Sequence, residues 1–253
     1  MEPTDYIYGL RPVIEAINAE KEIDKIFISK DLQGDLATEL NQLLRQHRDI
    51  VVQRVPVEKL NRITRRNHQG VIAILSAAVT YLKLDDLVPQ LYEDGRLPFL
   101  VALDGITDVR NFGAIARTAE CVGADALVIP MRGSVSVGGD AVKTSAGALS
   151  YLPVCRERNL AGALRFLKNN GYQVVAVSEK ADVNYTLAEY TGPVVLVMGA
   201  EDVGISPEVM AECDTRVSLP MFGHIGSLNV SVAAAIMMYE VVRQRLAADM
   251  EVI

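Results

Sequence analysis

Hydrophobic and polar positions alternate in short blocks along this chain, and the blocks predict a mixed α/β protein. In the first third, apolar residues at helical spacing are separated by short runs rich in valine and isoleucine. Helices are predicted at 12–19, 36–47 and 57–63, and strands at 25–29, 50–55 and 70–75. This pattern is typical of a small α/β domain over residues 1–78.

The strands predicted after Leu97 are more uniformly apolar. They cover residues 99–103, 126–129, 173–177, 194–198 and 217–219. Near-continuous valine, isoleucine and leucine runs between helical segments indicate a parallel sheet with both faces covered. We therefore predict a second α/β domain over 97–253, and a linker over 79–96, where mixed charge, Pro89 and Gly95 interrupt the pattern.

Composition narrows the class of protein. With 253 residues, half of them hydrophobic and 23% charged, the chain can bury a large core. It shows no signal-peptide pattern, and its apolar segment 230–239 is too short to span a bilayer. Three widely spaced cysteines and three scattered histidines fit neither a disulfide framework nor a zinc site. We expect a reduced, cytoplasmic protein with no metal and no membrane contact.

Charge is unevenly distributed between the two predicted domains. Residues 1–78 hold 11 Lys/Arg and 11 Asp/Glu, so the net charge of −7 lies in the rest of the chain. That balance argues against wholesale wrapping of a nucleic acid. A neutral domain can still present a local basic face to phosphates.

Three polar segments stand where predicted strands give way to helices: 111–117, 199–204 and 227–231. Ligands of parallel sheets bind beyond the carboxyl ends of the strands, so these segments predict one shared site. Asn111 is expected to begin a helix as its N-cap, with Arg117 in the second turn leaning back toward it. A surface ion pair of Arg117 with Asp108 or Glu120 is the plainer alternative.

The second and third segments have structural alternatives as well. Glu201 stands between Gly199 and Gly204, before the helix start at Ser206, so it is either a solvated carboxylate or the partner of a basic residue. One of Ser227 and Asn229 is expected to cap the apolar C-terminal helix, which leaves the other polar group spare.

The combined set favours positioning and electrostatic catalysis over covalent chemistry. The chain has no dinucleotide or Walker-type glycine loop and no Gly-x-Ser-x-Gly elbow. A nucleotide-dependent oxidoreductase is a weak alternative for this reason.

At this point the motifs resemble those of the SpoU family of RNA 2'-O-ribose methyltransferases, within the SPOUT superfamily. The resemblance rests on Asn-x-Gly-x-x-x-Arg at 111–117, Met-Gly-Ala-Glu-x-x-Gly at 198–204, and Leu-Pro-Met at 219–221 with Ser-Leu-Asn-Val-Ser at 227–231. The first third is similar to the family's L30e-like substrate-binding domain, through Tyr8-Gly9-Leu10 and the run 68–73. The layout is most similar to the bacterial 23S rRNA (guanosine-2'-O)-methyltransferase branch.

The resemblance implies a C-terminal trefoil knot, S-adenosylmethionine as cofactor, and a homodimer formed through the catalytic domains, in which each site could borrow residues from the partner. It assigns the cofactor to Gly199, Leu219 and Leu228, with Val203 and Ile225 nearby. The catalytic set it implies is Asn111, Arg117, Glu201, Ser227 and Asn229.

Within that set we expect Arg117 to stay protonated, to orient the ribose-phosphate and to stabilise the developing alkoxide. Asn111 and Ser227 are expected to orient the ribose, Glu201 to hold Arg117, and Asn229 to fix the cofactor loop. In the first domain we expect RNA contacts from Arg62, Arg65, Arg66 and His68, because arginines suit phosphates and unpaired bases. A solvated basic helix end is the alternative there.

Two further alternatives to methylation of ribosomal RNA are open. The same chemistry could act on transfer RNA, or the scaffold could be a catalytically silent RNA-binding protein.

Overall fold

The structure is a computed structural model that describes residues 6–19, 21, 23–47, 50–75 and 79–251. The chain divides into two compact units. The smaller unit contains Met1–Ala78 with Ser136–Asp140, and the larger unit contains Val79–Val135 with Ala141–Ile253. Both are built from strands and helices, and each is described by itself below.

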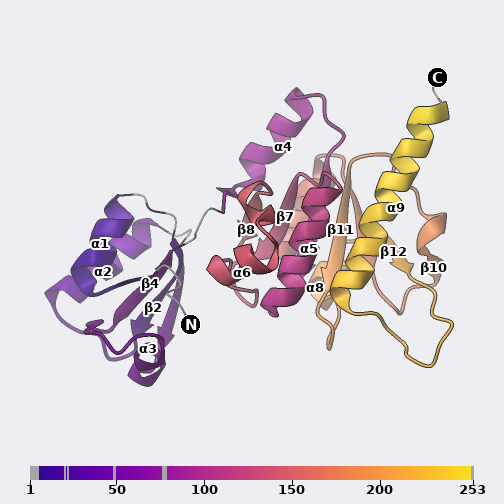
Figure 1. Ribbon diagram of the computed structural model, residues 1–253. Coiled ribbons are helices and arrows are strands. Elements are labelled where there is room, and N and C mark those ends of the chain that lie inside the picture. Colours follow the sequence, from indigo (N-terminus) through magenta and orange to yellow (C-terminus); the bar gives the residue numbers. More distant parts are fainter. Residues whose placement is uncertain (1–5, 20, 22, 48–49, 76–78, 252–253) are drawn as a thin grey trace. The chain divides into compact units, whose positions relative to one another are not determined.

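The smaller unit is a mixed sheet with helices packed on it (Figure 1), and its four strands have the order β1-β4-β2-β3. Strand β2 pairs in parallel with β3 and antiparallel with β4, which pairs antiparallel with β1. The elements are β1 (Tyr6–Tyr8), α1 (Leu10–Asn18), β2 (Ile23–Ser29), α2 (Asp35–Gln46), β3 (Val51–Val55), α3 (Val57–Ile63) and β4 (Val71–Leu75).

The two faces of this sheet are covered differently. Helices α1 and α2 bury one face, where Ile26 and Ile28 of β2 meet Leu40 of α2 and the apolar side of α1. The other face carries a smaller cluster in which Leu60 of α3 packs with Val55 and Ile72. Because side chains alternate along a strand, the partly exposed residues between these positions belong to the second face.

The larger unit is an eight-stranded sheet in the order β10-β12-β9-β11-β6-β7-β8-β5, with every observed pairing parallel. Its strands are β5 (Tyr81–Leu82), β6 (Phe99–Asp104), β7 (Ala126–Pro130), β8 (Val154–Glu157), β9 (Gln173–Val177), β10 (Val183–Asn184), β11 (Val194–Gly199) and β12 (Thr215–Ser218). Its helices are α4 (Leu84–Glu93), α5 (Val109–Cys121), α7 (Leu160–Asn169), α8 (Pro207–Met210) and α9 (Val230–Glu251), with 3-10 turns η1 (Ala148–Ser150) and η2 (Tyr185–Leu187). Helix α6 (Gly139–Thr144) also belongs to it from Ala141 onward.

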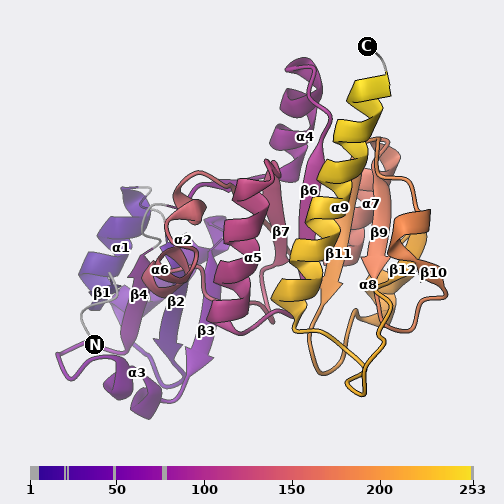
Figure 2. The same ribbon diagram turned by 45° about the vertical axis from the view of Figure 1, so that its right-hand side comes forward.

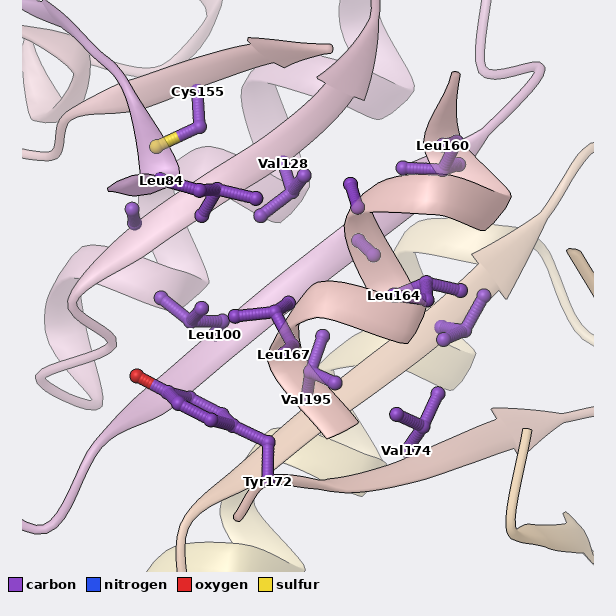
Figure 3. Packing of buried hydrophobic residues seen from close by; sticks show 14 of the residues in the cluster. Leu84, Leu100, Val128, Cys155, Leu160, Leu164, Leu167, Tyr172, Val174 and Val195 are labelled. Atoms are coloured by element: carbon purple, nitrogen blue, oxygen red, sulfur yellow. The ribbon is translucent and has the colours of Figure 1, made fainter. Parts of the chain in front are cut away.

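Helices cover this sheet on both faces (Figure 2). On one face α4, α7 and α8 pack on alternate strand residues, among them Leu100 and Val195. Figure 3 shows Leu164 and Leu167 of α7 pointing onto these strands. Helices α5 and α9 run side by side over the opposite face. With both faces filled, the open parts of the sheet are its strand ends.

The predicted fold class is confirmed: the larger unit holds the expected parallel sheet, and the smaller unit holds the expected α/β elements. Strands β1, β5, β8 and β10 were not predicted. The linker prediction for 79–96 also needs correction, because β5 pairs with β8 and α4 buries Leu84, Leu87 and Leu91 in the core of the larger unit. The trefoil knot stays a prediction.

Candidate active site

A cleft of about 440 Å³ opens where strands β9, β11 and β12 end. Its walls are the stretches that follow these strands. It is lined by Val177–Lys180 at and after the end of β9, by Met198–Ile205 at and after the end of β11, and by Leu219, Met221 and Gly226–Val230 after β12, with Met210 and Ala233 from the neighbouring helices. The second and third of the predicted polar segments therefore share one cavity.

The side chain of Asn229 joins all three segments. Its Nδ2 donates to Asn111 Oδ1 at 3.0 Å and also to Glu201 Oε1. Its Oδ1 accepts from the backbone N–H of Ser231 at 3.0 Å and from the Ser231 hydroxyl. An asparagine amide has two N–H donors and one carbonyl oxygen, so the amide is fully used. Residues 118 positions apart in sequence are thereby brought into direct contact.

Glu201 has a different partner from the one predicted. Its Oε1 accepts from Asn229 and from the backbone N–H of Val230 at 3.1 Å, and no bond to Arg117 is present in the described part of the chain. Val230 is the first residue of α9, whose initial N–H groups lack partners within the helix. A carboxylate is favoured there by the helix dipole. Glu201 thus stabilises the start of a helix 29 residues away.

Asn229 is the cap of α9, as one branch of the sequence analysis allowed. Its carbonyl oxygen accepts from Val232 and Ala233, and its side chain accepts from Ser231. Ser227 is therefore the spare polar group. It is exposed, and it lines the cleft.

Helix α5 begins earlier than predicted, at Val109. Asp108 is its N-cap, with the carboxylate accepting from the backbone N–H groups of Arg110 and Asn111 at 2.7 and 3.1 Å. The pKa of Asp108 is lowered by the hydrogen bond from the Arg110 side chain and by these two backbone donors. The prediction that Asn111 caps the helix was wrong, and its side chain is instead free to meet Asn229.

Arg117 lies in the third turn of α5 rather than the second. Its side chain is exposed, and within the described residues it has no hydrogen bond or ion pair. The surface pairing with Asp108 does not form, because Asp108 pairs with Arg110. Arg117 does not line the cleft of its own chain. It is an unneutralised cation on the helix that carries Asn111.

Two motif glycines are required by close backbone approach. A Cβ on Gly199 would lie 2.3 Å from the backbone carbon of Gly204 and 2.3 Å from the nitrogen of Ile205. A Cβ on Gly113 would lie 2.2 Å from Thr144 Oγ1. Real atoms cannot approach this closely, so any larger residue must displace the loop after β11 or the contact of α5 with α6.

Four of the five residues predicted to bind a cofactor line the cleft: Gly199, Val203, Leu219 and Leu228. Ile225 is 77% exposed and does not line it. Val177–Lys180 also line the cleft but were not predicted as site residues, although the strand 173–177 was predicted. The rule about carboxyl ends of strands applies to β9 as well and would have found them.

In the smaller unit, the predicted RNA-contacting residues divide into two groups. Arg62, Arg65 and Arg66 are exposed. His68 is buried; its Nδ1 accepts from the backbone N–H of Gly70 at 3.0 Å, so its Nε2 carries the proton donated to Asn61 Oδ1 at 3.0 Å. Both ring nitrogens are used in holding this turn, so we withdraw His68 as an RNA ligand.

Within the described residues, no group of three or more His, Cys, Asp or Glu side chains is arranged to hold a metal ion. Among the helices of the described residues, none has the length and apolarity needed to cross a membrane.

Comparison with known proteins gives two family matches. Residues 98–239 match the SpoU rRNA Methylase family, and residues 6–80 match the family described as RNA 2'-O ribose methyltransferase substrate binding. A Bacillus subtilis protein, YacO, named for the TrmH family of tRNA/rRNA methyltransferases, is 37% identical over 95% of this chain and 96% of its own length.

Solved structures of RNA methyltransferases are also similar to this chain. The AdoMet-bound rRNA methyltransferase from Sinorhizobium meliloti matches with a TM-score of 0.59 and 29% identity, over 94% of this chain and 86% of that one. The TrmH/SpoU tRNA modifying enzyme from A. aeolicus matches with a TM-score of 0.55 and 32% identity, over 66% of this chain and 86% of that one.

Proposed function

This chain belongs to the SpoU methyltransferase family and is an S-adenosylmethionine-dependent RNA 2'-O-ribose methyltransferase. From that premise we propose that it methylates the ribose of a guanosine in 23S ribosomal RNA. We place this reaction in the cytoplasm. The resemblance drawn from the three motifs is confirmed by the two family matches.

The observation that carries the ribosomal substrate is the extent of the similarity. The rRNA methyltransferase from S. meliloti matches nearly the whole chain, whereas the tRNA modifying enzyme from A. aeolicus matches two thirds of it. Most of the smaller unit, which matches the substrate-binding family, falls within the part that is similar to the rRNA methyltransferase. Methylation of transfer RNA is the second candidate, because YacO is named for both substrates.

The cleft fits S-adenosylmethionine in size and chemistry. Its volume lies in the usual range for small-ligand sites, and its lining combines apolar and polar residues. Leu219, Leu228 and Val203 offer apolar contact, and Gly199 lets the loop after β11 fold back closely on itself at the wall of the cleft. The bound cofactor supplies the methyl group on its sulfonium sulfur.

The chain's own residues position the ribose and manage charge. Arg117 is exposed and unpaired, so we propose that it binds the ribose-phosphate and stabilises negative charge as the 2'-oxygen loses its proton. It is a poor base, because a guanidinium stays protonated in proteins. Asn111 and Ser227 are proposed to orient the ribose. Asn229 and Glu201 are proposed to hold the three segments together.

The C-terminal helix supports the proposed homodimer. Its residues Val232, Ile236, Tyr239, Leu246 and Met250 are exposed and recur at spacings of three, four and seven, so they form one apolar stripe. The opposite side of α9 is buried on its own sheet through Val230, Ala234, Met237, Met238 and Val241. A helix that is apolar on both sides is expected to be covered on both.

A homodimer also offers a role for Arg117, which does not line its own cleft. We propose that Arg117 completes the cleft of the partner subunit. Leu246→Glu is expected to convert a dimer to a monomer in sedimentation experiments, and Leu187→Glu, at a more exposed leucine in another part of the unit, is expected to leave the dimer intact. A monomeric unsubstituted protein would contradict this assembly.

The function itself is tested by mapping 2'-O-methylation across total RNA from cells with and without the gene. Loss of one guanosine mark in 23S rRNA, restored by the unsubstituted gene but not by Arg117→Ala, is the expected result. A lost mark in transfer RNA would transfer the proposal to the second candidate. An unchanged map would favour a silent RNA-binding protein.

A further inference from the structure

The second face of the smaller sheet carries a row of aromatic rings. Strand pairing places Tyr8 beside Ile72, Ile72 beside Phe27, and Phe27 beside Gln53. The neighbouring row begins with Tyr6, whose ring centroid lies 6.0 Å from that of Tyr8. The isoleucine at the centre is fully buried, whereas the three rings are only half-buried.

Cations flank these rings. Lys59 Nζ lies 4.9 Å from the centroid of the Phe27 ring, and Arg66 Cζ lies 5.9 Å from that of Tyr8. Arg66 Nη1 also donates to the Tyr8 hydroxyl at 3.3 Å. We call this surface the aromatic face; its members are Tyr6, Tyr8, Lys25, Phe27, Lys59 and Arg66.

Two of the cations lie close enough to repel each other. The pKa of Lys25 is lowered, first by burial and then by the positive charge of Lys59. Lys25 precedes Phe27 on β2 by two residues, so both side chains point to the same face. An anion bound between the two ammonium groups would relieve this repulsion.

Packing within the smaller unit explains only in part why these rings and cations lie together on the surface. Cation–π pairs at exposed sites stabilise a fold weakly, and three half-exposed rings leave apolar surface in water. A nucleic acid supplies both missing partners, since bases stack on aromatic rings and phosphates pair with cations. Bases in a duplex are stacked on each other and cannot reach the rings, whereas unpaired bases can.

We propose that the aromatic face binds unpaired RNA bases by stacking on Tyr8 and Phe27, with Lys25, Lys59 and Arg66 holding the adjacent phosphates. The proposal rests on the proposed function and names how the smaller unit recognises its RNA. It assigns the substrate's single-stranded loops, rather than its helices, to this unit.

Fluorescence gives a direct test, because the chain contains no tryptophan. In the full-length Phe27→Trp variant the introduced indole is the single tryptophan. A single-stranded RNA of about 12 nucleotides is expected to quench its emission by stacking, whereas the same sequence annealed to its complement is expected to leave it nearly unchanged. Equal quenching by the duplex, or none by the single strand, would overturn the proposal.

Affinity measurements separate the rings from the charges. Tyr8→Ala is expected to weaken single-strand binding about ten-fold, Tyr8→Phe to change it little, and Phe27→Leu to weaken it without emptying the site of apolar volume. Tyr151→Ala, an 80% exposed tyrosine of the larger unit, is the matched control. Thermal melting identifies any variant that does not fold. If Tyr8→Ala does not fold, the affinity of Phe27→Leu decides the test.

The two proposals fail separately. A protein that methylates RNA but keeps its affinity in Tyr8→Ala and Phe27→Leu would remove the aromatic face and leave the function standing. A protein that binds single strands through these residues but transfers no methyl group would do the reverse.

Discussion

The two sheets of this protein leave different surfaces open. In the larger unit, helices cover both faces, and the accessible groups lie where the parallel strands end. In the smaller unit, α1 and α2 cover one face, and half-buried rings remain on the other. The first arrangement concentrates loop backbone and polar side chains in a cleft, and the second presents a broad apolar and basic surface.

The difference teaches how one chain can divide its work. Strand ends at a shared edge hold a few groups at fixed distances, which suits a reaction that needs precise positioning. A sheet face offers area and charge with looser geometry, which suits recognition of a flexible polymer. The comparison predicts that substitutions at the cleft lower the rate of methyl transfer, whereas substitutions on the face of the smaller sheet lower the affinity for RNA.

The largest effect is expected from Gly199→Ala. Its new Cβ would overlap the backbone at Gly204 and Ile205, which cannot move as a flexible side chain would. We expect undetectable cofactor binding by calorimetry, no methyl transfer, and a loss of about 1–3 kcal/mol in unfolding free energy from overpacking. Gly192→Ala is the control, because its Cβ would meet no atom within 4 Å. Normal cofactor affinity in Gly199→Ala would contradict the assignment of this cleft.

Arg117→Ala is expected to lower kcat by about 10²–10³ while cofactor affinity persists, because the side chain stands outside its own cleft. Arg117→Lys keeps the charge and tests whether the planar guanidinium matters. Lost cofactor affinity would mean that Arg117 builds the cavity. Mixing Arg117→Ala with Gly199→Ala subunits is expected to restore part of the activity, since one cleft of each mixed dimer then has all its parts.

A smaller loss is expected from Asn229→Asp. The substitution keeps an oxygen that can cap α9, but it removes both N–H donors and sets a carboxylate against Glu201. We expect about a ten-fold loss of activity, because the substitution removes hydrogen bonds next to a charged carboxylate. Adding Glu201→Gln removes the repulsion and is expected to recover activity. A double mutant no better than the single one would show that the two side chains are not coupled.

The smallest effect is expected on the face of the smaller unit. Charge reversal of Arg65 and Arg66 is expected to weaken RNA binding and to reduce the slope of log K against log salt by about 0.7 for each phosphate that the protein no longer neutralises. Arg11→Glu with Lys21→Glu changes charge equally at exposed positions on and after α1 and is expected to leave that slope unchanged. Equal effects from both pairs would mean that net charge alone matters.

Periodicity predicted most of the fold. The strand 173–177 and the helix 57–63 agree with β9 and α3 at both ends. The strand combines a strong apolar pattern with burial, whereas α3 is mostly exposed and buries Leu60. Strand β1 was missed because three residues give too little alternation to read. Strand β8 was missed because its second half, Arg156-Glu157, is charged and only half-buried, so it lacks the apolar run of the other strands.

The site was predicted as a set of segments but not as a set of bonds. Carboxyl-end positions placed Glu201 and Asn229 together correctly. The partner of Glu201 could not be read locally, because the helix start it stabilises comes 29 residues later. The N-cap of α5 was predicted at the wrong residue, because Asp108 and Asn111 are equally good cap residues. The choice between them depends on the course of the loop after β6.

The side-chain amide of Asn229 links the formation of the active site to the folding of the larger unit. Its two donors reach groups 118 and 28 residues upstream, so the junction forms only after strands from across the larger unit have assembled. A nascent or partly melted chain can hold any one of the segments without holding the reaction geometry. The reaction geometry therefore depends on the tertiary fold of the larger unit, and Asn229 is one side chain through which the two are coupled.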